Sequence, residues 1–388
     1  MTHYRRVGRV PPKRHTVARD DAGNRLLEEL MGSEGFSGSS SLLYHRASPS
    51  ALVSIDALHD GREPLVANHP VTPMHVRTQE LTDSERDAPG QDLVGGRAVV
   101  AGNDDVVIAV VDGGVSSPLY RNAAGDEVVF ILEGSADLRS TFGTMPVGAG
   151  DYVVIPAGTT HQWVPHGNVR ALVLESTGHV RTPRRYLTDD GQFRPGTPYC
   201  ERDLRTAPDP LLDPDGSRDV VVRTRHGLSL HRHEHSPFDV VGWDGGLYPY
   251  ALSIHDFEPI VGSLHQPPPV HQTFEGTHFV VCSFVPRPFD FHPDAVKIPY
   301  HHANVDSDEV LFYVGGNFMS RAGAGIEIGS LTLHPAGFVH GPQPGSWERS
   351  VDATRTDETA VMIDTFAPLS LAPTAMQAAD PTYLSSWR

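Results

Sequence analysis

The chain has 388 residues, of which 39% are hydrophobic, and its formal net charge is -17 with histidine neutral. This length suffices for two domains with full cores, and the negative charge argues against binding to nucleic acid or to anionic lipid surfaces. The 37 glycines and 33 prolines are spread along the chain, which is typical of many short strands joined by turns.

The N-terminal segment holds a cluster of basic residues, Arg5, Arg6, Arg9, Lys13 and Arg14. We interpret it as a solvated arm that packs on the body of the protein or on a neighbour. No apolar run follows it, so it does not resemble a secretory signal. No stretch of the chain reaches the roughly 18 apolar residues that span a bilayer. Residues 26–31 come next and predict a short helix.

The number of cysteines limits which metal sites the protein can form and indicates its cellular compartment. Only Cys200 and Cys282 are present, and they lie far apart in the chain. A disulfide scaffold and a thiolate zinc site are therefore excluded, a reducing compartment fits, and we expect a cytoplasmic protein. Histidine is abundant, with 22 copies, so imidazole and carboxylate groups must hold any metal.

Two segments of the chain resemble each other. Residues 126–134 read DEVVFILEG and residues 308–316 read DEVLFYVGG. Each is followed about 30 residues later by a second match, PAGTTH at 156–161 and PAGFVH at 335–340. Two signals that recur in the same order at similar separation indicate duplication of a whole domain.

The local composition of the repeat predicts strands. The apolar run after DEV is β-branched and aromatic and too short for a helix, so it reads as a buried strand that ends at a glycine turn. We therefore predict an N-terminal arm and a first barrel over residues 1–215, and a second barrel over residues 216–388. The loop-like residues 211–216 lie near this boundary, and residues 375–379 predict a short helix in the tail.

These motifs carry a family resemblance. The DEV and PAGxxH elements resemble the two motifs of the cupin superfamily, and two in tandem resemble a bicupin. The resemblance implies an all-β fold of two tandem cupin (jelly-roll) barrels with few short helices. Further segments resemble the bacterial homogentisate 1,2-dioxygenases, namely YRRVG at 4–8, EGFSG at 34–38, SLLYH at 41–45, SPFDVVGW at 236–243 and PYHHAN at 299–304.

The resemblance implies one metal centre in the second barrel, held by His302, Glu309 and His340. Two imidazoles and one carboxylate form the facial triad of Fe(II) oxygenases, with positions left open for substrate and oxygen. Successive strand residues point to opposite faces, so only one of His301 and His302 can reach the metal, and the Pro-Tyr-x-His pattern selects His302. The family spacing of five residues would select Asp308. A one-residue bulge would keep Glu309, which we favour.

The first copy departs from this pattern. It keeps Glu127 and His161, but Tyr120, Arg121 and Asn122 stand before the glutamate. Two protein ligands rarely suffice for a catalytic metal, so we predict a metal-free, structural first barrel. His161 is then expected to be a hydrogen-bonded residue of the core or rim.

The resemblance also implies an activity. It is the Fe(II)-dependent cleavage of homogentisate by O2 to maleylacetoacetate, in tyrosine and phenylalanine breakdown. His265 is implied as the acid–base residue, because a histidine can take up and return a proton near neutral pH. Tyr300 and Arg321 are candidates for binding the substrate carboxylate. Asn317 and Phe318 stand where homogentisate enzymes carry a His-Tyr pair, so the pocket wall differs and the ring substrate stays open.

Other functions remain open from the sequence. The ring could be gentisate or a related hydroxylated aromatic acid. The chain could also be a non-catalytic double-cupin binding or storage protein, or a manganese or zinc isomerase on the same barrel. The family resemblance further implies a homo-oligomer, a trimer or a hexamer.

Overall fold

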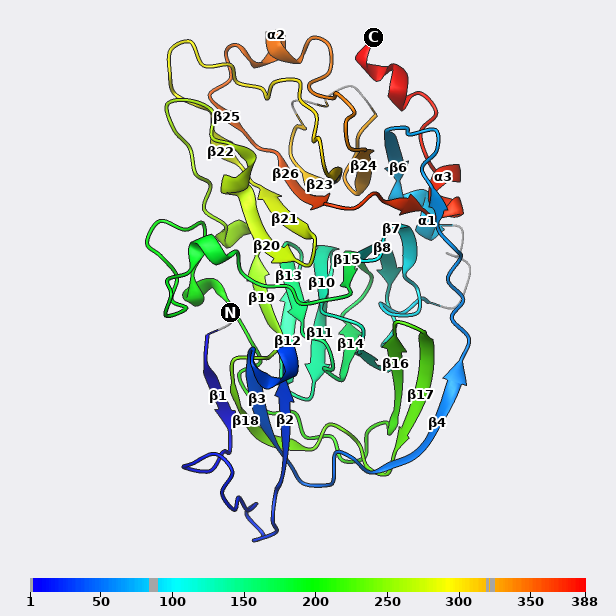
Figure 1. Ribbon diagram of the computed structural model, residues 1–388, viewed down its shortest axis with the longest axis vertical. Coiled ribbons are helices and arrows are strands. Elements are labelled where there is room, and N and C mark those ends of the chain that lie inside the picture. The colour runs from blue at the N-terminus through cyan, green and yellow to red at the C-terminus, as the bar shows by residue number, and fades with distance from the viewer. Residues whose placement is uncertain (1–2, 84–89, 319–320, 322–324) are drawn as a thin grey trace.

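The computed structural model describes residues 3–83, 90–318, 321 and 325–388 (Figure 1). These ranges consist mainly of short β-strands, which confirms the prediction of an all-β protein with few short helices. The α-helices are α1 (Thr78–Asp83), α2 (Ser346–Ser350) and α3 (Pro373–Gln377), and the 3-10 segments are η1 (Glu34–Phe36), η2 (Arg184–Tyr186), η3 (Glu201–Asp203), η4 (Ile254–Asp256), η5 (Pro268–His271) and η6 (Tyr383–Trp387). No helix in the described ranges is long and apolar enough to cross a bilayer.

Two large sheets enclose the first barrel. The first contains, in spatial order, β19 (Tyr250–Ser253), β13 (Asp151–Ile155), β10 (Glu127–Glu133), β15 (Val169–Ser176), β8 (Val106–Gly113), β7 (Ala98–Gly102), β27 (Ser370–Leu371) and β5 (Val66–Ala67). The second contains β12 (Gly143–Gly148), β11 (Ser135–Ser140), β14 (His161–Pro165), β9 (Leu119–Asn122), β16 (Asp219–Thr224), β17 (Gly227–His233) and β4 (Leu52–Leu58). Side chains of both sheets, among them Ile131, Val153 and Trp163, form one buried core between them.

The second barrel is built on a six-stranded sheet. Its strands are β20 (Gln272–Gly276), β21 (Phe279–Phe284), β26 (Thr359–Thr365), β23 (Asp308–Gly315), β24 (Ser330–His334) and β6 (Met74–Arg77), with the small pair β22 (Arg287–Pro288) and β25 (Arg355–Thr356) beside it. A four-stranded sheet of β1 (Arg5–Gly8), β18 (Val240–Gly245), β3 (Ser40–His45) and β2 (Leu27–Gly32) completes the fold. This arm sheet lies at the lower end of Figure 1 and the second barrel at the upper end.

The DEV segments form the central strands of both barrels, as their composition predicts. β10 pairs antiparallel with β13 and β15, and β23 pairs antiparallel with β24 and β26. Val128 and Phe130 of β10 belong to the same buried cluster as Val310 and Phe312 of β23, so the two barrels share a core. Each such side chain contributes roughly 1.5–3 kcal/mol of stability through removal from water.

Strands cross between the two halves of the chain. β6 adds to the sheet of the second barrel, whereas β27 near the C-terminus adds to the sheet of the first. β16, β17 and β19, which follow residue 215, also lie in the sheets of the first barrel. The division at residue 215 stays a prediction, and the exchanged strands tie the two halves together.

The N-terminal arm corrects one prediction. Residues 26–31 do not form a helix, because Leu27–Gly32 forms β2, which pairs antiparallel with β3 along its whole length. Hydrogen bonds to the neighbouring strand outweigh the modest helix preference of these residues. β1 pairs with β18, so the basic arm packs on the body of the protein. In the tail, α3 begins two residues before the predicted helix and overlaps it.

Candidate metal centre

The two copies of the repeat fold alike around their aspartates. The carboxylate of Asp126 accepts hydrogen bonds from the amides of Ala157 and Val180, both at 2.8 Å. Asp308 likewise accepts from the amides of Ala336 and Leu369, both at 2.8 Å. The Asp of the DEV motif therefore anchors the PAG turn in each barrel. Both oxygens of Asp308 are occupied by backbone amides, so this carboxylate is not placed as a metal ligand.

The copies also share their spacing before the glutamate. Tyr120 pairs with His161 in the first barrel, as His302 pairs with His340 in the second. Tyr120 thus stands where the second copy has His302, and each precedes its glutamate by seven positions. The register of β23 is regular at Glu309 and shifts only near Gly315, so the bulge expected before Glu309 is not needed.

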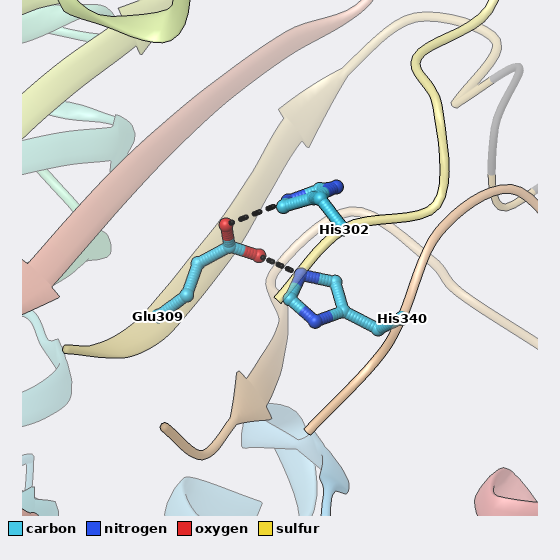
Figure 2. A group of neighbouring side chains, drawn as sticks. All are labelled: His302, Glu309 and His340. Carbon is cyan, nitrogen blue, oxygen red and sulfur yellow. Dashed lines mark hydrogen bonds and ion pairs between the residues drawn. The ribbon is translucent and has the colours of Figure 1, made fainter. Parts of the chain in front are cut away.

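The structure brings His302, Glu309 and His340 together (Figure 2). Their nearest nitrogen and oxygen atoms all lie within 4.8 Å of one another. The Nε2 of His340 lies 3.1 Å from the Oε1 of Glu309, and the Nε2 of His302 lies 3.7 Å from the Oε2. Glu309 and His340 are buried and His302 is half-buried, whereas the side chain of the neighbouring His301 is exposed.

Backbone contacts set the tautomers of both histidines. The Nδ1 of His302 lies 3.1 Å from the carbonyl oxygen of Tyr300, and the Nδ1 of His340 lies 3.0 Å from that of Phe338. A carbonyl can only accept, so each Nδ1 carries the proton and each Nε2 is left with a lone pair. Two lone pairs and a carboxylate therefore converge on one point, which is the donor set of a divalent metal ion.

A comparison of charges between the barrels tests whether a cation fits here. In the first barrel, the guanidinium of buried Arg97 donates to both oxygens of Glu127 at 2.9 and 3.0 Å and to Glu175 at 2.7 Å. Glu309 and Asp364 occupy the equivalent paired positions of the second barrel. No arginine or lysine in the described part of the chain forms an ion pair with either of them. A metal ion would supply the positive charge that Arg97 supplies in the first barrel.

The sequence analysis missed His334, which the structure places beside the three residues. Its Nδ1 lies 2.8 Å from the Oε1 of Glu309, and its Nε2 lies 2.8 Å from the hydroxyl of Tyr383. Burial lowers the pKa of His334 to about 4, so the ring is neutral, donates to Glu309 and accepts from Tyr383. His334 faces Glu309 across the β23–β24 pair, where the first copy has Ile155. A polar residue at this apolar position is the signal that could have revealed it.

Buried carboxyl groups at the centre respond to their neighbours in opposite ways. Burial favours the neutral form of Glu309, but the contacts with His302, His334 and His340 outweigh it and hold its pKa well below the usual range. Burial, together with the charge of Glu309, raises the pKa of Asp364 to about 7. The centre thus combines one firmly ionised carboxylate with a second that ionises with difficulty.

A cavity of about 200 Å³ opens beside Glu309 and His302. Three predicted residues line it, namely His265, Tyr300 and Arg321. Phe318 does not line it, because its ring packs edge-on against Tyr313 with centroids 5.1 Å apart. The wall also contains groups that the sequence analysis did not single out, namely His271, Phe284, Arg287, Phe289, Lys297, Glu358 and Asp364.

Comparisons with known proteins agree with this architecture. A cupin domain model matches residues 96–176, which contain the strands β7 to β15 of the first barrel. The chain is 39% identical to the "Putative dioxygenase" of Saccharolobus solfataricus over 396 aligned residues, which cover 100% of this chain and 99% of the relative. It is 24% identical to the homogentisate 1,2-dioxygenase of Emericella nidulans, over 68% of this chain and 62% of the relative. The homogentisate 1,2-dioxygenase of Bradyrhizobium diazoefficiens is also 24% identical, over 69% of this chain and 62% of its own length. The chain therefore belongs to the cupin superfamily and to the dioxygenase family of the Saccharolobus protein, and it is a distant relative of the homogentisate 1,2-dioxygenases.

Proposed function

We propose that the protein is an Fe(II)-dependent ring-cleaving dioxygenase that converts homogentisate and O2 to maleylacetoacetate. The observation that carries this proposal is the group of His302, Glu309 and His340, of which His302 and Glu309 line a cavity. Two imidazoles and one carboxylate leave open coordination positions on the metal, as oxygenases of this type require.

The three ligands would hold the iron through the two Nε2 atoms and the carboxylate of Glu309. Bound ferrous iron supplies the redox chemistry that lets a hydroxylated ring react with O2. His334 fixes the orientation of Glu309 through its 2.8 Å contact, and Tyr383 in turn fixes His334. Such supporting contacts tune both affinity and ligand geometry.

The cavity fits an aromatic acid because it combines apolar rings with cationic side chains. Two guanidinium groups reach it. Arg321 already donates to the carbonyl of Gly341 at 2.8 Å and lies over the ring of Trp387. Arg287 lies over the ring of Phe284, and among the described residues its side chain donates only to the carbonyl of Val285, at 3.1 Å. We therefore assign the substrate carboxylate to Arg287, with Arg321 as the alternative.

In this proposal His265 exchanges a proton with a ring hydroxyl. Its ring meets that of Tyr300 edge-on with centroids 5.3 Å apart, and its Nδ1 lies 3.8 Å from the Oδ2 of Asp290. Tyr300 also lies edge-on to His302, at 6.1 Å. Tyr300 therefore stands between the proposed base and the metal ligand and can position the ring that lies against them.

Oxygen consumption tests the proposal. Protein loaded with Fe(II) without air is given homogentisate or gentisate, while O2 uptake and the absorbance of the ring-opened product are followed. The expected result is uptake with product formation from homogentisate, lost in His302→Ala and retained in His301→Ala, the matched control at the exposed neighbour. Cleavage of gentisate alone would keep the reaction type and overturn the substrate. Absence of uptake with both acids by iron-loaded protein would contradict the enzyme reading and favour a binding protein.

A further inference from the structure

A second, polar pocket lies far from the metal centre. It has a volume of about 60 Å³ and is bounded by β2 and β3 of the arm, by β9, and by the segment from His233 to Asp239. β2, β3 and β17 lie at the lower end of Figure 1, whereas β23 and β24 lie at the upper end. The SPFDVVGW motif contributes Ser236, Pro237 and Asp239 to its wall, a role separate from the proposed catalysis.

Arg121 gives this pocket an unusual cation. Its Nε and Nη2 both donate to the hydroxyl of Thr160, at 2.9 and 2.6 Å, and its Nη1 has no partner among the described residues. No carboxylate of the described chain forms an ion pair with it. Burial lowers the pKa of Arg121, because only the more distant Glu29 offsets the loss of solvent. A guanidinium in this setting is stabilised by an anion.

Two further polar atoms on the pocket-lining residues are buried and have no hydrogen-bond partner in the described part of the chain. They are the Nε2 of His233 and the Oγ1 of Thr141, whose residues are each 7% exposed. Burial lowers the pKa of His233 to about 4, with Arg121 adding to the effect, so its ring is neutral and can donate one N–H. Unpaired buried donors are costly, and groups left in this state within a pocket indicate a missing ligand.

The acidic residues of the pocket are already engaged. His45 contacts the Oδ1 of Asp239 at 2.6 Å and the Oε2 of Glu29 at 2.8 Å. The other oxygen of Asp239 accepts from the amide of Ala47 at 2.7 Å. The aspartate of the SPFDVVGW motif thus holds His45 in place, and the positive charge of His45 offsets part of the acidic charge nearby.

We propose that this pocket binds a small oxyanion (phosphate, sulfate or a carboxylate) through Arg121, His233 and Thr141. The guanidinium supplies the charge, and the imidazole N–H and the threonine hydroxyl complete a set of donors. The site is independent of the iron and of ring cleavage.

Isothermal titration calorimetry on the iron-loaded full chain, in a buffer free of phosphate and sulfate, tests the site. Inorganic phosphate, sulfate and acetate are titrated separately, so that the arms distinguish an inorganic oxyanion from a carboxylate that is not the proposed substrate. The expected result is saturable binding of at least one of them, weakened about tenfold or more in Arg121→Gln. The affinity should be unchanged in His302→Ala, which alters only the metal centre.

Two further variants distinguish a loss of anion binding from a failure of the protein to fold. Thr141→Ala removes a hydroxyl that has no partner in the free protein, so it should weaken binding several-fold without lowering the melting temperature. Glu29→Gln removes a negative charge from the wall and should tighten binding. Binding that is unchanged in both Arg121→Gln and Thr141→Ala, or lost in His302→Ala, would overturn the proposal, as would the absence of saturable binding of all three anions at millimolar concentration.

Discussion

Replacing Arg97 with methionine tests the charge argument that distinguishes the two barrels. The side chains of Arg97 and Glu127 are 2% and 0% exposed, and they meet in a two-pronged ion pair at 2.9 and 3.0 Å. In Arg97→Met the carboxylate of Glu127 keeps only the 3.0 Å hydrogen bond from Asn122. Removing one partner of a buried ion pair costs about 3–5 kcal/mol, because it leaves an uncompensated charge. We expect the free energy of unfolding to fall by that amount.

The loss of unfolding free energy in Arg97→Met depends on pH, and the sign of this dependence follows from the pKa of Glu127. In the wild type, burial favours the neutral form of Glu127, but Arg97 outweighs it and lowers the pKa, so this carboxylate contributes stability that is lost as the pH falls. In Arg97→Met, burial is uncompensated and raises the pKa of Glu127 above its ordinary value. The folded variant then binds more protons than the unfolded chain, and its stability rises as the pH falls. The difference in unfolding free energy between the wild type and Arg97→Met should therefore become smaller as the pH is lowered from about 8 to about 5.

Urea denaturation at both pH values measures this difference. The double variant Arg97→Met/Glu127→Gln should recover at least half of the loss, because Glu175 keeps its contacts with Arg62 at 2.6 and 2.7 Å. A loss below about 1 kcal/mol, or a loss that is equal at both pH values, would refute the reasoning.

Three other predictions concern variants of His334, Arg287 and His45. His334→Asn should weaken Fe(II) binding about 10- to 100-fold in an equilibrium titration, because Glu309 loses the group that orients it; unchanged affinity would contradict this role. Arg287→Met should raise KM for homogentisate about tenfold or more with a smaller effect on kcat, as steady-state kinetics can show, whereas an effect on kcat alone would argue against a carboxylate contact. His45 is buried, but its contacts with Asp239 and Glu29 raise its pKa from 6.5 to about 9, so its contribution to stability is full below pH 6.5 and is lost as the pH rises through 9. A melting-temperature series on His45→Gln should lack this dependence, and an identical pH profile in the variant would exclude His45 as its source.

The repeat made the fold and the place of the candidate centre predictable. The DEV and PAG elements are local signals whose residues make the same backbone contacts in both barrels, as Asp126 and Asp308 show. Apolar runs of β-branched and aromatic residues then predict the central strands. The metal role of His302, Glu309 and His340 stays a prediction, although the structure brings them together.

What the sequence left open depended on contacts between distant segments. The contact that argues against Asp308 as a ligand comes from the amide of Leu369, which lies 61 positions along the chain and belongs to no recognisable motif. The bulge was inferred by comparing this chain with a family pattern, whereas the first copy of the repeat has the same spacing as the second.

One wrong prediction and one overlooked residue have the same origin. Residues 26–31 have helix-forming side chains, but the strand β3 takes up their backbone hydrogen bonds. Arg287 lies in the short strand β22, away from every motif, and reaches the cavity only because the second barrel folds around it. The oligomeric state and the cytoplasmic location stay predictions.

The iron content of matched histidine variants tests the central claim most directly. His340 and His161 are the last histidines of the two PAGxxH turns, and only the first belongs to the candidate centre. After loading with Fe(II) and removal of excess metal, the wild type and His161→Gln should each retain one iron per chain, whereas His340→Gln should retain none. Iron retained by His340→Gln, or lost from a folded His161→Gln, would contradict the account.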